Sequence, residues 1–284
     1  MPDALHRAVA PGRPYRVAAA DTTDLVREAI LRHGPRPTGA LALARALTVV
    51  ALASILDKHQ GRLSMQWLGR GDLGTLTAEF RTPGDLRGYL TGAGDSSDVA
   101  EGFGAGGLLS VIRQQESGAF TQGQVALADK SVDGDVEAWL QRSDQVPSAL
   151  RVFVERDDEG YPRRVGGLLV QALPGGTQRE LNGLLAPGFA GRELPDGFPD
   201  DPRALAALVP GLELEWLEEA PLRFHCTCNP ERVQAGVRLL GAAELQEMID
   251  EGEEPEVHCD WCSVTYRVDV DALKAILADL LETA

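Results

Sequence analysis

Apolar positions recur with helical spacing in two segments near the start of the chain. The first is residues 25–33, which follow an Asp-Thr-Thr run at residues 21–23 suited to capping a helix and end at a Gly-Pro pair at residues 34–35. The second is residues 37–58, a longer stretch rich in Ala and Leu. We therefore predict two helices, and we expect the second to be a buried helix of the core.

Runs of β-forming residues separated by glycine-containing turns follow these helices and predict a sheet. The predicted strands are residues 62–68, 75–80, 87–91, 108–114, 123–127, 150–155 and 164–173, with a short amphipathic helix at residues 132–141. This mixture predicts an α+β fold. Residues 1–174 are long enough to bury a substantial core, and we assign them to a core domain.

The character of the sequence changes at the Pro-Gly-Gly run of residues 174–176. From there to residue 221 the chain is rich in Gly and Pro, with short apolar pieces at residues 205–209 and 212–217. Such a segment has enough apolar surface to dock on a core but little stability of its own. Residues 175–221 are therefore predicted to be a metastable, partly helical linker that is docked in one state and released in another. A loop-rich subdomain that stays folded is the alternative.

Residues 222–284 form a small C-terminal region. Helices are predicted at residues 230–240, 242–250 and 272–281 and a strand at residues 264–270, and an acidic run occupies residues 251–256. A region of this size cannot bury enough apolar area to fold by packing alone. It needs a further source of folding free energy.

All four cysteines of the chain lie in this region, in two close pairs. Cys226 and Cys228 form a CxC pair, and Cys259 and Cys262 form a CxxC pair after a gap of residues 229–258. Four thiolates that converge tetrahedrally make a closed structural zinc site, so the spacing predicts one zinc ion per chain. Four buried thiols or static disulfides are the alternatives, and disulfides would imply an oxidising compartment.

Two histidines, a tryptophan and an aspartate lie next to these cysteines. His225 and His258 each precede a cysteine, but four cysteines already complete a tetrahedron, so we interpret both histidines as neighbours rather than ligands. Trp261 is expected to shield the sulfurs by packing, with contact to another protein as the alternative. Asp260 and the acidic run are expected at the surface.

A four-cysteine zinc site couples thiol chemistry to folding. Metal binding supplies folding free energy to a small domain, so loss of the metal should unfold it. A thiolate cluster can be oxidised, and oxidation expels the zinc. The sequence thus suggests a redox-dependent unfolding switch, and a purely structural zinc site is the open alternative.

Charge and hydropathy limit the partners and the compartment. The net charge is −16, and residues 222–284 hold five Lys and Arg against thirteen Asp and Glu, which argues against nucleic-acid binding. The first 20 residues lack an apolar core of signal-peptide length, and the apolar run at residues 40–56 is broken by Arg45. We therefore expect a cytoplasmic protein without a membrane span, whose thiols stay reduced.

The chain resembles a known family over nearly its whole length. The CxC, gap and CxxC pattern is that of the bacterial redox-regulated heat-shock chaperones, the 33 kDa chaperonin family. Segments of the first part also resemble family segments in family order: QWLGRGD at residues 66–72, LRG at 86–88, RSDQVP at 142–147 and GGLLVQ at 166–171. The RSDQVP element and the cysteine pattern are the most specific of these.

The resemblance implies a holdase that is inactive when reduced and zinc-bound. Cys226, Cys228, Cys259 and Cys262 would be the zinc ligands, and oxidation would form the disulfides Cys226–Cys228 and Cys259–Cys262 and release the zinc. The zinc domain and the linker would then unfold, and the protein would form a homodimer and bind unfolding client proteins without ATP. In agreement, the sequence contains no GxxxxGK[ST] phosphate-binding loop.

Two other classes of function stay open from the residues alone. The CxxC pair could serve a thiol oxidoreductase, although it lies late in the chain without the βαβ context of a thioredoxin-like site. The cysteines could instead hold a constitutive zinc-ribbon module that binds other proteins. We favour the chaperone, a protein that is not an enzyme.

Overall fold

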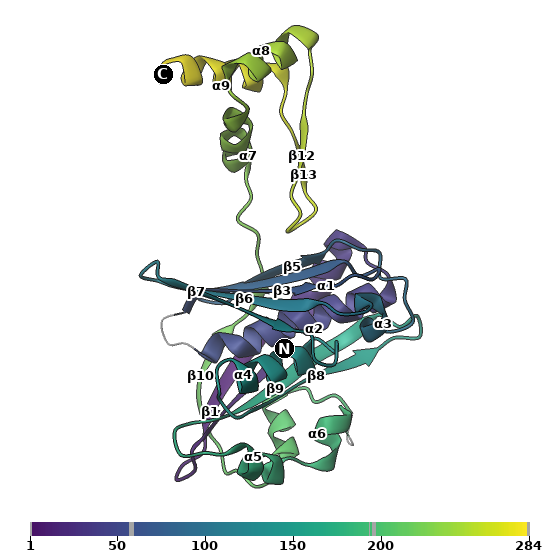
Figure 1. Cartoon of the computed structure of the whole chain (residues 1–284), viewed down its shortest axis with the longest axis vertical. Coiled ribbons are helices and arrows are strands. Elements are labelled where there is room, and N and C mark those ends of the chain that lie inside the picture. The colour runs from purple at the N-terminus through teal and green to yellow at the C-terminus, as the bar shows by residue number, and fades with distance from the viewer. Residues whose placement is uncertain (1, 57–59, 193, 195–196, 283–284) are drawn as a thin grey trace. The chain divides into compact units, whose positions relative to one another are not determined.

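The computed structural model describes residues 2–56, 60–192, 194 and 197–282. The chain forms two compact units, Met1–His225 and Cys226–Ala284, and the elements of each are labelled in Figure 1. Helices and sheets occur in both units, which confirms the predicted α+β class. Residues 175–221 belong to the first unit, so in this structure the segment predicted to be a linker is folded together with the core.

The first unit contains a five-stranded antiparallel sheet with the strand order β10-β1-β2-β9-β8. Strands β8 and β9 are the predicted strands at residues 150–155 and 164–173. Strands β1, β2 and β10 are not among the predicted ones: β1 and β2 are rich in Ala, which has low β propensity, and β10 lies in the segment assigned to the linker. The strands are β1 (Ala4–Val9), β2 (Tyr15–Asp21), β8 (Ser148–Arg156), β9 (Pro162–Ala172) and β10 (Glu215–Pro221).

A second sheet has six strands in the order β11-β5-β4-β3-β6-β7, and its pairs are antiparallel except for β11, which runs parallel to β5. Strands β3 to β7 match the five predicted strands between residues 62 and 127 within a few residues at their ends. The strands are β3 (Gln60–Leu68), β4 (Thr75–Arg81), β5 (Asp85–Leu90), β6 (Leu108–Gln115), β7 (Phe120–Ala126) and β11 (Arg223–Phe224).

Helix α2 (Pro37–Ala53) is the centre of the core and contacts both sheets. It continues as a short 3-10 turn, Ser54–Leu56, so the predicted helix is confirmed as far as residue 56, and residues 57–58 lie outside the described part. Pro37–Leu56 has the length and apolarity of a membrane span, but 83% of its most apolar window is buried inside the protein. The prediction of a buried core helix therefore holds.

Helix α1 (Thr23–His33) begins at the predicted place, and its capping groups come partly from the predicted Asp-Thr-Thr run and partly from elsewhere. Thr22 makes no side-chain capping bond, and Asp21 accepts a hydrogen bond from the Thr23 amide at 2.9 Å. The carboxylate of Asp3 accepts from the next two amides, Asp24 at 2.9 Å and Leu25 at 2.5 Å. The start of the chain is thereby fastened to the first turn of the helix.

Two further helices complete the core, α3 (Val99–Phe103) and α4 (Asp133–Arg142), and α4 is the predicted amphipathic helix.

The five-stranded sheet is buried on both faces. Its residues Leu5, Ala18 and Leu169 face the α2 side, whereas Val17 and Leu168 face a second apolar layer. That layer is built by the described residues between 178 and 212, which include α5 (Gln178–Leu184), α6 (Pro187–Gly191) and the 3-10 helix η2 (Pro202–Leu208). Burial on both sides explains why β9 is an almost continuous apolar run rather than an alternating one.

The second unit is small and has a modest core. Its helices are α7 (Pro230–Val237), followed by a 3-10 turn Arg238–Leu240, α8 (Ala242–Glu251) and α9 (Val270–Glu282), and its hairpin is β12 (Glu256–His258) with β13 (Thr265–Arg267). The strand predicted at residues 264–270 is shorter, because Val270 already begins α9. Strand β12 was not predicted, since it starts at the end of the acidic run. Six apolar residues are buried: Val237, Leu245, Val268, Leu273, Ile276 and Leu277.

Candidate metal centre

The four cysteine sulfurs lie together in the second unit. Every Sγ is within 4.8 Å of the other three, with Cys226 to Cys259 at 3.8 Å and Cys228 to Cys262 at 3.2 Å. A tetrahedral zinc ion with Zn–S bonds of about 2.3 Å places its sulfurs about 3.8 Å apart. The cluster therefore has the size and ligand type to bind one zinc ion.

The first pair lies directly before helix α7. The Asn229 side chain caps this helix by accepting a hydrogen bond from the Arg232 amide at 2.8 Å, and Pro230 occupies its first turn. The Arg232 guanidinium donates to the Thr227 hydroxyl at 2.6 Å, which fixes the residue between the two cysteines. The cap and this bond hold the short CxC segment so that both sulfurs reach one point.

The second pair lies in the turn of the β12–β13 hairpin. The Cys259 carbonyl accepts hydrogen bonds from the amides of Cys262 at 3.2 Å and Ser263 at 2.8 Å, and the Cys259 amide donates to the Val264 carbonyl at 3.0 Å. Ser263 closes the turn in the left-handed conformation, at φ 57°. This tight turn directs both sulfurs of the CxxC pair to the same side.

The electrostatics of the cluster favour a bound cation. Burial raises the pKa of the Cys259 and Cys262 thiols. Burial opposes ionisation of Cys228 as well, but hydrogen bonds from the Tyr266 hydroxyl and the neighbouring thiols lower its pKa to about 7. The same hydrogen bond raises the pKa of Tyr266 to about 12. Four thiolates so close together need positive charge between them, which Zn²⁺ supplies.

The structure also gives the surroundings of the two histidines, the tryptophan and the aspartate that lie next to the cysteines in the sequence. His225 belongs to the first unit, where its Nε2 lies 4.0 Å from Asp85 Oδ2, and His258 Nδ1 lies 3.2 Å from the Thr265 hydroxyl. Trp261 is half-buried, and Asp260 is exposed as expected. Tyr266 is the neighbour that the sequence did not indicate, because no spacing rule links a hydroxyl on the strand after a CxxC pair to the metal.

Loss of the Tyr266 hydroxyl should weaken zinc binding. The hydroxyl lies 3.1 Å from Cys228 Sγ, and it stabilises the thiolate that would bind the ion. We expect Tyr266→Phe to lower the zinc affinity by about tenfold, the lower end of the range for such contacts. Competition with a chromogenic zinc chelator measures this. Tyr161→Phe, in a turn of the first unit, is the matched control, and equal affinities of the two variants would contradict the prediction.

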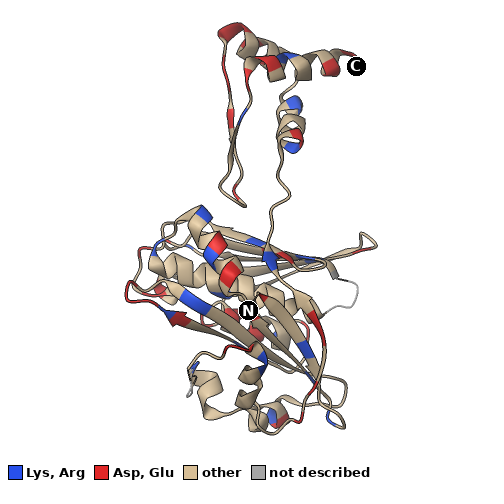
Figure 2. Cartoon of the chain, turned by 180° about the vertical axis from the view of Figure 1, so that it is seen from behind, with Lys and Arg blue, Asp and Glu red and all other residues tan. Residues whose placement is uncertain are grey.

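The surface of the second unit is acidic. Figure 2 shows Asp and Glu on helix α8, on α9 and along the hairpin, as the net charge of residues 222–284 requires. The cysteine cluster thus lies in a module that carries an excess of negative charge.

Comparison with known proteins identifies the family. The model of the Hsp33 protein family matches residues 3–269. The chain belongs to the Hsp33 family. Among its relatives is a protein of Bacillus licheniformis named 33 kDa chaperonin, which is 32% identical over 96% of this chain and 98% of its own length. A 33 kDa chaperonin of Thermus thermophilus is 33% identical, over 96% of this chain and 86% of the relative.

A solved structure shows the same fold. The crystal structure of a 33 kDa chaperonin, a heat shock protein 33 homologue from Thermotoga maritima, matches 98% of this chain and 99% of that one. The TM-score is 0.83 at 23% sequence identity. The resemblance that the cysteine pattern and the RSDQVP element indicated is therefore confirmed, and this Hsp33 family member carries a C-terminal cluster of four cysteines close enough to bind a metal ion.

Proposed function

We propose that this protein is a redox-regulated, ATP-independent chaperone of the holdase type. In the reduced state Cys226, Cys228, Cys259 and Cys262 hold one zinc ion, and the protein is inactive. Oxidation releases the zinc, unfolds residues 222–284 and the linker of residues 175–221, and exposes apolar surface. The relatives' name, 33 kDa chaperonin, and the four-cysteine cluster support this proposal.

The observation that carries the proposal is the apolar layer over the five-stranded sheet. Leu181, Phe189, Leu205, Leu208 and Val209 are almost fully buried there. They pack on β2, β8 and β9, on the face of the five-stranded sheet that points away from α2. If this apolar layer leaves the sheet, both the sheet and the layer expose contiguous apolar surface, which binds the apolar segments of unfolding proteins.

The linker also contributes a strand to the same sheet. Strand β10 pairs with β1 along its length, and the chain continues from β10 through β11 to Cys226. Only a few residues lie between the end of β10, at Pro221, and the first cysteine, Cys226. Unfolding of the zinc domain therefore acts on the end of the strand that fastens the linker to the core, which gives oxidation a route to the apolar layer.

The redox step needs an oxidant such as hydrogen peroxide. For each disulfide, two thiols lose two electrons and two protons, and one peroxide molecule is reduced to two water molecules. Every pair of sulfurs lies within 4.8 Å, so the sulfurs can meet once the ion leaves. The proposed disulfides, Cys226–Cys228 and Cys259–Cys262, rest on the resemblance to the family. Peptide mapping by mass spectrometry tests the pairing.

Further parts of the proposal concern the assembly and the compartment. The active form is a homodimer, residues 1–174 bind clients and form the dimer, and the protein works in the cytoplasm, where reduced thiols keep it inactive. A thiol oxidoreductase is less consistent with the site, because the CxxC pair lies in a hairpin turn rather than at the N-terminus of a helix.

The test follows zinc content and chaperone activity in one experiment. The reduced protein is expected to contain one zinc per chain and to leave the aggregation of a heat-denatured reporter unchanged. After treatment with peroxide at mild heat, zinc should be released and aggregation should be suppressed without ATP. Equal suppression by both forms, or zinc retained when all four cysteines are changed to Ser, would contradict the proposal. Reductase turnover would favour the oxidoreductase instead.

A further inference from the structure

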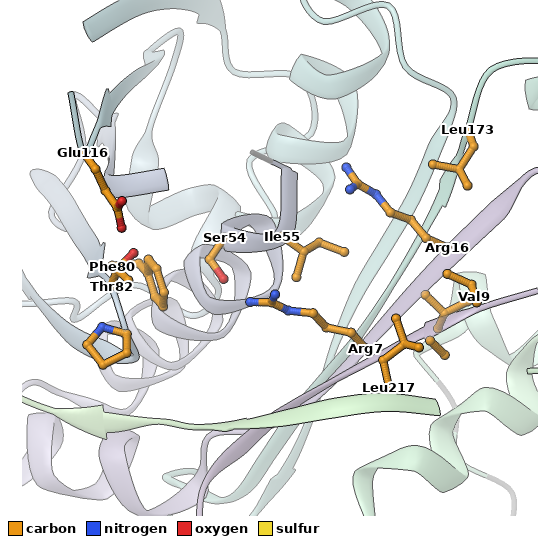
Figure 3. Close-up of a pocket in the computed structure, with 13 residues that line it drawn as sticks. Arg7, Val9, Arg16, Ser54, Ile55, Phe80, Thr82, Glu116, Leu173 and Leu217 are labelled. Atoms are coloured by element: carbon orange, nitrogen blue, oxygen red, sulfur yellow. The ribbon is translucent and has the colours of Figure 1, made fainter. Parts of the chain in front are cut away.

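A cavity of about 550 Å³ opens in the first unit, away from the cysteines. It lies between the five-stranded sheet, the end of helix α2 at Ser54 and Ile55, and the turn that joins β4 to β5. Figure 3 shows Arg7 extending from its strand across this cavity toward Ser54. The volume is that of a small-molecule site.

Strand register places two arginines on the same side of the sheet. Val9 on β1 pairs with Arg16 on β2, and Arg7 pairs with Ala18. Arg7 and Arg16 are therefore diagonal neighbours on the face that α2 covers, and both line the cavity just beyond the end of that helix.

Neither arginine is neutralised by a carboxylate in the described part of the chain. Arg16 donates through Nε to the Gln171 side chain at 2.7 Å and through Nη2 to the Leu56 carbonyl at 3.4 Å, both uncharged groups. Burial and the nearby positive charge of Arg7 lower the pKa of Arg16. Glu116 is the one carboxylate among the described residues that line the cavity, and no ion pair joins it to either arginine. The two arginines therefore leave the lining with a net positive charge that an anion can neutralise.

The rest of the wall is mainly apolar and partly uncovered. Ile55 and Phe80 are buried at one side, whereas Leu173 and Leu217 are 36% and 54% exposed. Leu217 is directed here by a β-bulge, because the pairing of β10 with β1 shifts register between His6 and Ala8. The cavity therefore offers an apolar surface next to the two guanidinium groups.

We propose that this cavity binds an amphipathic anion, a small molecule with an unbranched apolar body and one carboxylate or phosphate head. Arg7 and Arg16 pair with the head, and Ile55, Phe80, Leu173 and Leu217 contact the body. Arg7 supplies the main charge contact, since it extends into the cavity and has no hydrogen bond or ion pair among the described residues.

Binding should be linked to the state of the linker, and this step rests on the proposed function. Leu217 belongs to β10, the linker strand that pairs with β1. A ligand that contacts Leu217 binds only while β10 is docked, so it stabilises the docked form over the released one. With the ligand bound, a higher concentration of oxidant would be needed to activate the chaperone.

Calorimetric titration of the reduced, zinc-loaded full chain tests the site. The probes are decanoate and decyl phosphate, below the concentrations at which they form micelles, with decanol and inorganic phosphate as controls for the body and the head. We expect the two amphipathic anions to bind and each control to bind at least about tenfold more weakly. Binding of decanol as tight as that of decanoate, or no binding of either anion, would overturn the proposal.

Matched variants locate the site. Arg7→Gln should weaken decanoate binding by about tenfold, whereas Arg13→Gln, an exposed arginine in the β1–β2 turn, makes the same charge change and should bind as the wild type does. Thermal unfolding of both variants serves as a control for folding. We expect it to match that of the wild type, because neither side chain is buried. Equal affinities of the two variants would place the ligand elsewhere and overturn the assignment.

The oxidised, zinc-free protein separates this inference from the proposed function. We expect it to bind decanoate at least about tenfold more weakly than the reduced protein, because β10 is released. Unchanged binding by an oxidised form that does suppress aggregation would overturn the link to the linker. Absence of any oxidation-dependent suppression would count against the proposed function, while the binding assigned to the reduced protein would still be decided by Arg7→Gln.

Discussion

Removal of zinc is expected to abolish the protection of residues 226–284 against hydrogen exchange and to leave residues 1–174 protected. Among its described residues, the second unit has an apolar core of six buried side chains, and a domain of this size rarely gains more than about 3–5 kcal/mol from its core. Zinc binding to a four-cysteine site supplies about 10–16 kcal/mol at neutral pH. The metal therefore contributes more than the core, and the fold should not survive its loss.

Hydrogen exchange with mass spectrometry, before and after treatment with a chelator, measures this. Peptides from α8 and α9 should exchange as fast as unfolded peptides after zinc removal, and peptides from α2 and β9 should keep their protection. A variant with all four cysteines changed to Ser should behave as the chelated protein does, without chelator. Protection that persists in α8 and α9 after complete removal of zinc would show that packing alone holds this unit together.

Sequence patterns predicted the core elements well where one residue type dominates. Helix α2 is a nearly unbroken Ala and Leu stretch, and β9 is a continuous apolar run, so both were located within a few residues. The turns between β3 and β7 carry glycines that mark the strand ends. The cysteine pairs were equally informative, because CxC and CxxC leave little freedom in where four sulfurs can meet.

Other features depend on contacts between distant segments. Strands β1 and β10 have weak strand character, yet they pair because residues 4–9 and 215–221 are brought together by the rest of the fold. Likewise two of the three capping hydrogen bonds of α1 go to Asp3, and the side chain that anchors Arg16 is Gln171. Tyr266 contacts Cys228 only because the hairpin and the CxC segment converge. No local pattern encodes these partners.

Changing Leu205 and Leu208 to Ser is expected to activate the protein without an oxidant. Both side chains lie in η2, 2% and 6% exposed, within the apolar layer on the five-stranded sheet. Each truncation should weaken docking by about 2–5 kcal/mol. About 5.5 kcal/mol is enough to move a two-state equilibrium from 1:99 to 99:1, so the two changes together should release the linker in much of the population.

The reduced, zinc-loaded double variant should then suppress aggregation of a heat-denatured reporter, while the reduced wild type does not. The matched control changes two exposed leucines, Leu31 and Leu239, which are 74% and 87% exposed, to Ser, and it should stay inactive. Hydrogen exchange of residues 202–212 reports release of the linker independently of activity. A double variant whose linker is released but which remains as inactive as the wild type would show that linker docking does not control client binding, because the apolar surface would then be exposed without effect.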